Sequence, residues 1–238
     1  EEEVGDINMS RILGVGDPHG PVDHPGYRPF CQDIYDEYNC DTAVIIGDLA
    51  DQQAISFHAI NPDCPGPSDE YELTKMCMRK WYEAFSDALI CIGNHDERVI
   101  RKAQSVGIPA KYLRNYNEIW NTPGWLWEYE HHIDDVCFLH GTARSGINPA
   151  WNVMAKKMKS VVMGHCHSRA GVKFRTVHDK RYFAMDTGCG IDIDAFQFAY
   201  GKHCDERPIL GCGVIIDSIP YYEIMPCGPG ELYHRSNF

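Results

Sequence analysis

Five short apolar segments of the sequence each end in residues that are able to bind a metal ion. The segments lead into DPH, GDLAD, GNHD, HG and GHCH, which start at Asp17, Gly47, Gly93, His140 and Gly164. Carboxylate oxygens mixed with imidazole nitrogens suit Mn, Fe, Zn or Ni, whereas Mg and Ca favour oxygen ligands alone. Two such ions held ~3.5–4 Å apart can clamp the attacking and leaving oxygens of a phosphate ester. The pattern therefore indicates two-metal hydrolytic chemistry.

The predicted ligands share one position in the pattern, because each lies just past the end of an apolar segment. They are Asp17, His19, Asp48, Asn94, His140, His165 and His167. Two carboxylates leave two divalent ions with a net positive charge, which suits a phosphoryl group. Several other histidines fall outside the pattern and are expected in loops or at the surface. They are His131, His132, His178, His203 and His234.

Buried β-strands must position these ligands, because short apolar segments bounded by glycine are typical of such strands. In open α/β sheets, ligands bind at the carboxyl ends of the strands. The predicted strands cover about 11–16, 43–47, 88–92, 135–139, 160–164, 182–187, 212–217 and 220–225. Predicted helices cover about 30–41, 68–85, 98–105 and 152–159. This order predicts an α/β fold, a four-layer α/β/β/α sandwich of two mixed sheets packed face to face with helices outside.

One domain is expected over residues 9–238, and residues 1–8 are interpreted as an acidic leader or a cloning remnant. Within that domain, residues 106–134 separate two of the site strands and are rich in aromatic side chains, including Trp120 and Trp125. This segment has two open interpretations, a lid or rim over the substrate and an aromatic secondary core. The apolar side chains at helical spacing from Leu73 to Phe85 are expected in the core.

The composition restricts the class of protein and the kind of partner. A chain of 238 residues with 44% hydrophobic and 24% charged residues is typical of a soluble globular protein. Its net charge of -12 disfavours a surface that holds a long nucleic acid, but not a small phosphorylated substrate at a metal site. Eleven scattered cysteines without a CxxC pair predict a reducing, cytoplasmic environment without a disulfide framework. No apolar run approaches the ~18 residues of a membrane span, so no membrane partner is expected.

The ordered set DPH, GDLAD, GNHD, HG and GHCH resembles the five blocks of the calcineurin-like metallophosphoesterase superfamily. The blocks run from Asp17 to His167, and each of them alone is a weak signal. The resemblance implies that Asp17, His19 and His167 bind a first metal and that Asp48 bridges both metals. It further implies that Asn94, His140 and His165 bind the second metal. His95 would stabilise the transition state or protonate the leaving oxygen, and a metal-bridging hydroxide would be the nucleophile.

Three further residues are predicted to support this site. Asp51 is expected to orient a ligand histidine by a hydrogen bond. Arg144 and Arg98 are candidates for gripping a substrate phosphate with two parallel hydrogen bonds. Two divalent transition-metal ions are the expected cofactors, with Mn first and Fe, Zn or Ni as alternatives.

Departures from the superfamily's protein phosphatases narrow the expected substrate. Here Gln52 follows Asp51 and Asp96 follows His95, where those phosphatases carry Arg and Glu, so a protein substrate is disfavoured. The sequence is more similar to small stand-alone phage and bacterial members, a resemblance that does not identify a substrate. The net charge of -12 instead favours small phosphate mono- or diesters or nucleotides over long duplexes. Two alternatives stay open. One is a nuclease that acts on DNA or RNA ends, and the other is a non-catalytic metal-binding scaffold for protein interactions.

Overall fold

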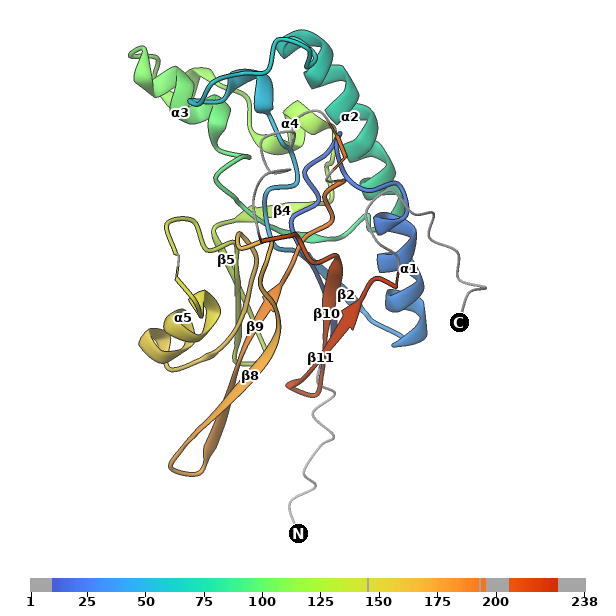
Figure 1. Cartoon of the computed structure of the whole chain (residues 1–238), viewed down its shortest axis with the longest axis vertical. Coiled ribbons are helices and arrows are strands. Elements are labelled where there is room, and N and C mark those ends of the chain that lie inside the picture. Colours follow the sequence, from blue (N-terminus) through green and yellow to red (C-terminus); the bar gives the residue numbers. More distant parts are fainter. Residues whose placement is uncertain (1–9, 145, 193, 196–205, 227–238) are drawn as a thin grey trace.

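The first of two β-sheets carries three of the segments that end in predicted ligands. The computed structural model describes residues 10–144, 146–192, 194–195 and 206–226, so residues 1–8, His203 and His234 lie outside the described part (Figure 1). The strands of this sheet are β1 (Arg11–Val15), β2 (Thr42–Ile45), β3 (Leu89–Cys91), β4 (Leu126–Glu128), β10 (Gly211–Ile216) and β11 (Ile219–Ile224). Their order is β11-β10-β1-β2-β3-β4. The strands β1 to β4 are parallel, β10 pairs antiparallel to β1 and β11 pairs antiparallel to β10, so the sheet is mixed.

The second sheet carries the other two segments that end in predicted ligands. Its strands are β5 (Glu130–Ile133), β6 (Val136–Leu139), β7 (Ser160–Met163), β8 (Ala170–Val177) and β9 (Lys180–Thr187). Their order is β5-β6-β7-β9-β8. The central strands β6, β7 and β9 are parallel, whereas the edge strands β5 and β8 pair antiparallel to their neighbours. This sheet is therefore mixed as well.

The two sheets pack face to face, because alternate residues of their strands point to opposite sides. Ile12 and Val44 of the first sheet form one buried cluster with Phe138 and Val162 of the second sheet. Leu13, which follows Ile12 in the same strand, belongs to another cluster on the outer face. Both faces of the central strands are thus buried, which explains why those strands are apolar at nearly every position.

Helices cover the outer faces of both sheets. The helices α1 (Tyr27–Glu37) and α2 (Pro67–Ala84) lie on the opposite side of the sheets from α5 (Pro149–Lys157) (Figure 1). Trp81 of α2 is fully buried in the cluster that contains Leu13, and Met154 of α5 is buried with Val161. The four-layer α/β/β/α sandwich predicted from the sequence is therefore confirmed.

Several predicted details differ from the structure. The helix α2 begins at Pro67, and Leu73 and Met76 are exposed rather than part of the core, because they face away from the sheet. Three strands, β4, β5 and β8, were not expected from the sequence. His131 was expected in a loop or at the surface, yet it is buried in β5 and its Nε2 lies 3.0 Å from the Ile90 carbonyl oxygen.

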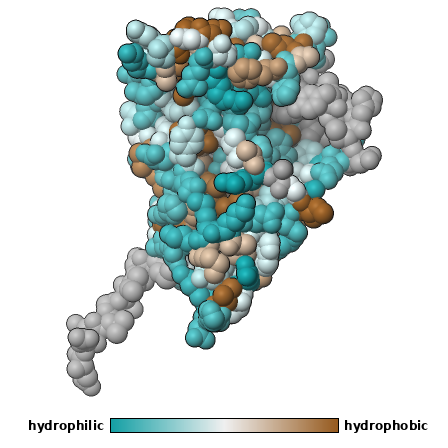
Figure 2. Space-filling model, turned by 90° about the vertical axis from the view of Figure 1, so that its left-hand side faces the viewer, coloured by the Kyte–Doolittle hydropathy of each residue, from teal (hydrophilic) through white to brown (hydrophobic). Residues whose placement is uncertain are grey.

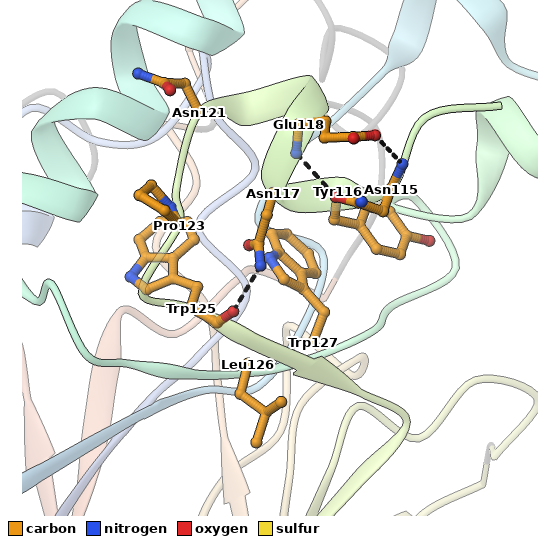
Figure 3. Close-up of a pocket in the computed structure, with 9 residues that line it drawn as sticks. All are labelled: Asn115, Tyr116, Asn117, Glu118, Asn121, Pro123, Trp125, Leu126 and Trp127. Atoms are coloured by element: carbon orange, nitrogen blue, oxygen red, sulfur yellow. Dashed lines mark hydrogen bonds between the residues drawn. The ribbon is translucent and has the colours of Figure 1, made fainter.

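The aromatic segment 106–134 forms part of the sandwich. It follows α3 (Arg98–Ser105) and contains η2 (Ala110–Tyr112), α4 (Tyr116–Trp120), β4 and β5. Asn115 caps α4 by accepting a hydrogen bond from the Glu118 backbone, and Asn117 donates to the Trp125 carbonyl (Figure 3). Trp120 and Trp125 are buried in the same cluster as Trp81. These two side chains extend the main core, and a rim over the substrate formed by the rest of the segment stays a prediction.

The surface is mostly hydrophilic, with hydrophobic side chains gathered at the end of the molecule that carries α3 (Figure 2). Val106 and Ile108 at the end of α3 are exposed, as is Phe57. In the part of the chain that the structure describes, none of the helices has the length and apolar character that crossing a membrane requires. All cysteines of the described residues are free thiols.

Candidate metal centre

The predicted ligands converge on one edge of the sandwich, where the parallel strands of both sheets end. Asp17, Asp48 and Asn94 follow β1, β2 and β3 of the first sheet. His140 and His165 follow β6 and β7 of the second sheet. Because the two sheets lie face to face, the loops after these strands meet across the sandwich. Five sequence segments that are far apart in the chain thus form one cluster.

The first group of ligand atoms comes from Asp17, His19 and His167, whose ligand atoms all lie within 4.8 Å of one another. Nε2 of His167 lies 3.2 Å from Oδ2 of Asp17 and 3.2 Å from Nε2 of His19. Asp17 and His19 are fully buried. Two imidazole nitrogens and a carboxylate that point at a common position form a set that suits a divalent transition metal.

The second group of ligand atoms surrounds Nε2 of His140. This nitrogen lies 3.0 Å from Oδ1 of Asn94, 3.1 Å from Nδ1 of His165 and 3.3 Å from Oδ2 of Asp48. The other ring nitrogen of His140 lies 2.9 Å from the Ile46 carbonyl oxygen, to which it can donate. That hydrogen bond leaves Nε2 as the nitrogen that can bind a metal.

Asp48 joins the two groups. Its Oδ2 lies 3.3 Å from Nε2 of His140 and 3.7 Å from Nε2 of His19, which belongs to the first group. Its other oxygen, Oδ1, accepts a hydrogen bond of 2.7 Å from the backbone N–H of His95. The backbone therefore fixes one oxygen, and the other lies between the two groups of ligand atoms.

Glycines of the motifs allow the carboxylates to lie directly against neighbouring loops. A Cβ atom at Gly93 would lie 2.2 Å from Oδ1 of Asp48, and one at Gly164 would lie 2.1 Å from Oδ1 of Asp17. Real Cβ atoms essentially never approach other atoms so closely, so both positions require glycine. The backbone itself is strained here, since His19, Asp48 and His165 have φ values of 57°, 46° and 70°. Such conformations are uncommon outside glycine and gather at functional sites.

Most groups of the cluster favour the charge state that metal binding needs, and His140 is the exception. Burial would raise the pKa of Asp48, but His140 lowers it well below its usual value, and the pKa of Asp17 is lowered in the same way. Burial lowers the pKa of His19 and of His165. Burial also opposes protonation of His140, yet Asp48 and Asp17 raise its pKa well above the usual value. The two carboxylates are ionised and attract positive charge, which a bound cation supplies in place of a proton.

An unpaired carboxylate oxygen and two close pairs of ring nitrogens indicate that the cluster fits a cation. Oδ1 of Asp17 is buried and accepts no hydrogen bond, although a buried carboxylate oxygen normally has a partner. Ring nitrogens face ring nitrogens at 3.2 Å between His19 and His167, and at 3.1 Å between His140 and His165. Two nitrogen lone pairs at this distance need a shared proton or a shared cation between them. The residues present therefore fit a divalent metal site.

His95 lies beside the two groups of ligand atoms, and hydrogen bonds with Asp51 and Arg98 hold its ring. Nδ1 of His95 lies 2.8 Å from the Asp51 carbonyl oxygen and 3.0 Å from Oδ1 of the same residue. Oδ1 of Asp51 also lies 2.9 Å from Nδ1 of His19, so one carboxylate orients both rings. Burial opposes protonation of His95, but Asp48 and Asp51 raise its pKa. Arg98 donates to the His95 ring rather than pointing freely at a substrate position.

Two other residues belong to the loops around the site, Arg144, which the sequence predicted, and Asp96, which it did not. Arg144 lies on the loop that follows His140, and it is exposed, with its backbone N–H bonded to the Gly141 carbonyl at 2.8 Å. Asp96 was not predicted to support the site. It is buried, and its carboxylate accepts hydrogen bonds from the backbone of Ala50 at 3.0 Å and of Gly93 at 2.9 Å. It thereby ties the loop after β2 to the loop after β3, and the Asp that ends GNHD is the signal that could have revealed it.

Comparisons with known proteins give one family match and several similar solved structures. The family model described as calcineurin-like phosphoesterase matches residues 10–192. Similar solved structures include a single mutant of Vps29 from Entamoeba histolytica, with 13% identity, a TM-score of 0.44 and coverage of 92% of this chain and 94% of that chain. A metallophosphoesterase from Sphaerobacter thermophilus has 14% identity, a TM-score of 0.46 and coverage of 91% and 88%. YfcE, a phosphoesterase from E. coli, has 11% identity, a TM-score of 0.42 and coverage of 86% and 87%. No curated protein matches the chain.

Proposed function

The chain belongs to the calcineurin-like phosphoesterase family, and from this membership and its His–Asp cluster we propose that it is a dinuclear metal-dependent phosphoesterase. The substrates that we propose are small phosphate mono- or diesters, including nucleotides. The observation that carries the proposal is the position of Asp48. Its Oδ2 lies 3.7 Å from Nε2 of His19 in the first ligand group and 3.3 Å from Nε2 of His140 in the second, which supports a carboxylate shared by two metals.

Each half of the site has its own proposed ligands. Asp17, His19 and His167 would hold one ion, and Asn94, His140 and His165 would hold the other, with Asp48 shared. Two divalent ions, when bound, supply an acidified water and positive charge for the phosphoryl oxygens. We propose manganese as the native metal, because the mixed oxygen and nitrogen set suits it, with Fe, Zn or Ni as alternatives.

The chain's own side chains would act on the leaving group. His95 lies beside the ligands with its side chain 18% exposed, so a substrate can reach it. Its Nδ1 faces Asp51, which leaves Nε2 directed toward Asp48 at 3.9 Å and toward Arg98. We propose that Nε2, once the ring is protonated and the hydrogen bond from Arg98 has opened, donates a proton or a hydrogen bond to the departing oxygen. Asp51 would hold the ring through Nδ1.

The proposed substrate class follows from the charge of the protein. A net charge of -12 opposes the many phosphate contacts that hold a long duplex, whereas a small ester needs only the local field of the site. The exposed Arg144, on the loop after His140, would meet a group that projects from the site. Nucleases and non-catalytic scaffolds are the alternatives that the experiment below must separate from this proposal.

Metal reconstitution combined with a substrate screen tests the proposal. Metal-stripped protein would be reloaded with Mn²⁺, Fe²⁺, Zn²⁺ or Ni²⁺, and its metal content would be measured beside turnover of phosphomonoesters, phosphodiesters and linear DNA. We expect about two ions per chain and turnover of small esters, both lost in Asp48→Asn and retained in Asp63→Asn, an exposed loop control. At most one ion per chain contradicts the dinuclear site. Two ions without turnover favour a scaffold, and DNA degradation without ester turnover favours a nuclease.

A further inference from the structure

The hairpin of β5 and β6 brings a glutamate, a histidine and a cysteine together on the outer face of the second sheet. Cys137 of β6 points to this face, because it is buried in one cluster with Met154 of α5. His132 of β5 lies directly opposite Cys137 in the register of the two antiparallel strands. Glu130 lies two residues before His132 and therefore projects from the same side of β5. Strand geometry thus gathers three side chains of metal-binding type at one place.

The ligand atoms of these three residues lie close to the separations of a tetrahedral metal site. Oε2 of Glu130 lies 3.5 Å from Nε2 of His132 and 3.8 Å from Sγ of Cys137. All three ligand atoms lie within 4.8 Å of one another. Zinc binds sulfur at ~2.3 Å and nitrogen or oxygen at ~2.0–2.2 Å in a tetrahedron, which places its ligand atoms roughly 3.4–3.6 Å apart. Small side-chain rotations therefore suffice to place a zinc ion among them.

An ammonium group already binds the carboxylate of this cluster. The helix α5, which ends at Lys157, lies beside the hairpin (Figure 1). Nζ of Lys157 lies 2.8 Å from Oε1 and 2.7 Å from Oε2 of Glu130. The lysine side chain is 29% exposed, and a partly exposed ion pair contributes only ~0.2–1 kcal/mol to stability. Lys157 can therefore turn into water and leave the carboxylate to a divalent cation.

We propose that Glu130, His132 and Cys137 bind a Zn²⁺ ion whose fourth ligand is a water molecule. Lys157 is displaced into solvent when the ion binds. A thiolate, an imidazole and a carboxylate together suit zinc, whereas Mg and Ca favour oxygen ligands alone. The sulfur of Cys137 binds the ion as a thiolate, and the thiol proton passes to solvent.

This zinc site is separate from the candidate metal centre. Cys137 lies near the start of β6, whereas His140 follows the end of that strand. The proposed ligands of the candidate metal centre are aspartates, histidines and one asparagine, so a cysteine ligand distinguishes the two sites. The inference therefore does not rest on the proposed phosphoesterase activity.

The burial of the three ligands gives the ion a path from solution to the sulfur. The side chains of His132 and Glu130 are 47% and 35% exposed, whereas Cys137 is buried. An ion meets the imidazole and the carboxylate first, and Sγ of Cys137 faces Oε2 of that carboxylate. Once bound, the ion links the edge strand β5 to β6 through side chains, in addition to the backbone pairing of the two strands.

Titration of the full chain with Co²⁺, a spectroscopic substitute for zinc, tests the proposal under reducing conditions. A thiolate bound to cobalt gives a sulfur-to-metal charge-transfer band in the near ultraviolet, which oxygen and nitrogen ligands do not give. We expect this band in the parent and its loss in Cys137→Ala. Cys166→Ala, which removes the thiol between His165 and His167, should keep the band. After zinc loading, Cys137→Ala should hold about one ion per chain fewer than the parent, whatever the candidate metal centre binds.

Variants of the two partly exposed ligands keep the test decisive if Cys137→Ala fails to fold. Glu130→Gln and His132→Ala should each weaken displacement of cobalt by zinc about tenfold or more, because each removes a ligand. His178→Ala, at the exposed turn between β8 and β9, is the control and should bind as the parent does. Lys157→Ala should bind about two- to fivefold more tightly, because it removes the competing ammonium group.

Circular dichroism shows which variants are folded, and the cobalt spectra of the folded ones decide. The proposal is overturned if the parent gives no sulfur-to-cobalt band, or if a folded Cys137→Ala keeps it. It is also overturned if Glu130→Gln and His132→Ala both bind zinc as tightly as the parent. Weaker binding by Lys157→Ala would overturn the displacement of Lys157, since the lysine would then support the ion instead of competing with it.

Discussion

The guanidinium of Arg98 lies 2.9 Å from Nε2 of His95. The same arginine donates to the Asp51 carbonyl oxygen at 2.7 Å, and Asp51 in turn faces Nδ1 of His95. Both nitrogens of one imidazole are thus held, and the ring stands edge-on to His19 at a centroid distance of 4.5 Å. Arg98, which the sequence suggested as a phosphate ligand, therefore acts on the position and the charge of His95.

We predict that Arg98→Ala lowers kcat about 10- to 100-fold without loss of metal, because a charged hydrogen-bond donor to His95 is removed. Arg98 lowers the pKa of His95, so its removal raises that pKa. If His95 acts as an acid, the fall in activity on the alkaline side moves to higher pH. The pH profiles of kcat check this, with Arg101→Ala on the exposed face of α3 as the control. A lower kcat with an unmoved alkaline limb would show a structural role only.

The close approach of Gly93 to Asp48 gives a second prediction. A Cβ atom there would lie 2.2 Å from Oδ1 and 2.3 Å from the backbone nitrogen of Asp48, and neither can move without disturbing the loop. Gly93→Ala should lower the free energy of unfolding by about 1–3 kcal/mol or more and reduce metal content, since Asp48 is displaced. Urea unfolding and elemental analysis measure both effects. Gly66→Ala, where a Cβ meets nothing within 4 Å, should change stability by less than about 1 kcal/mol and leave the metal in place.

The strands that end in predicted ligands could be located from the sequence, because they are buried on both faces and almost wholly apolar. The edge strand β8, AGVKFRTV, could not, since Lys173 and Phe174 are exposed and no alternation of polar and apolar residues marks one buried face. The strand β5 contains His131 and His132, which are weak strand signals, and its burial depends on pairing with β6. Tertiary contacts, and not the local sequence, therefore determine that both segments form strands.

The predicted ligands were found from residue type and position, because the chemistry of metals limits the choice to few side chains. Contacts between loops that are distant in sequence were not accessible in this way. Asp96 bonds to Ala50, which lies 46 positions earlier, and Arg98 bonds to Asp51, which lies 47 positions earlier. The roles of Trp120 and Trp125 likewise depend on packing against α2, which no local pattern encodes.

Asp186 should make stability depend on pH in the direction opposite to that of an ion-paired carboxylate. It is largely buried at the end of β9, its Oδ1 accepts no hydrogen bond, and burial raises its pKa from 3.8 to about 6. The folded state therefore binds the proton more tightly, and stability falls as pH rises from about 4 to above 6. The loss is at most about 3 kcal/mol, at ~1.4 kcal/mol per pKa unit. Asp186→Asn stays neutral and should not lose this stability.

Urea unfolding of the parent and of Asp186→Asn at several pH values measures this difference. The advantage of the variant should be small at pH 4 and should increase up to about pH 7. Asp179→Asn, at the exposed turn between β8 and β9, should follow the parent at every pH. An advantage that does not change with pH would mean that Asp186 is ionised in the folded state.

His95→Ala should separate catalysis from metal binding, because Asn94 and His95 are neighbours that point in different directions. Asn94 directs Oδ1 to within 3.0 Å of Nε2 of His140, whereas His95 faces Asp51 and Arg98. We predict that His95→Ala keeps its metal and loses about 10²–10⁴-fold in kcat for an ester with a poor leaving group. The loss should be smaller for a good leaving group, which departs without a proton. Asn94→Ala should instead lose metal and activity with both esters. Elemental analysis beside kcat for the two esters decides: if His95→Ala sheds metal or slows both esters equally, His95 is a ligand or an electrostatic stabiliser and not an acid.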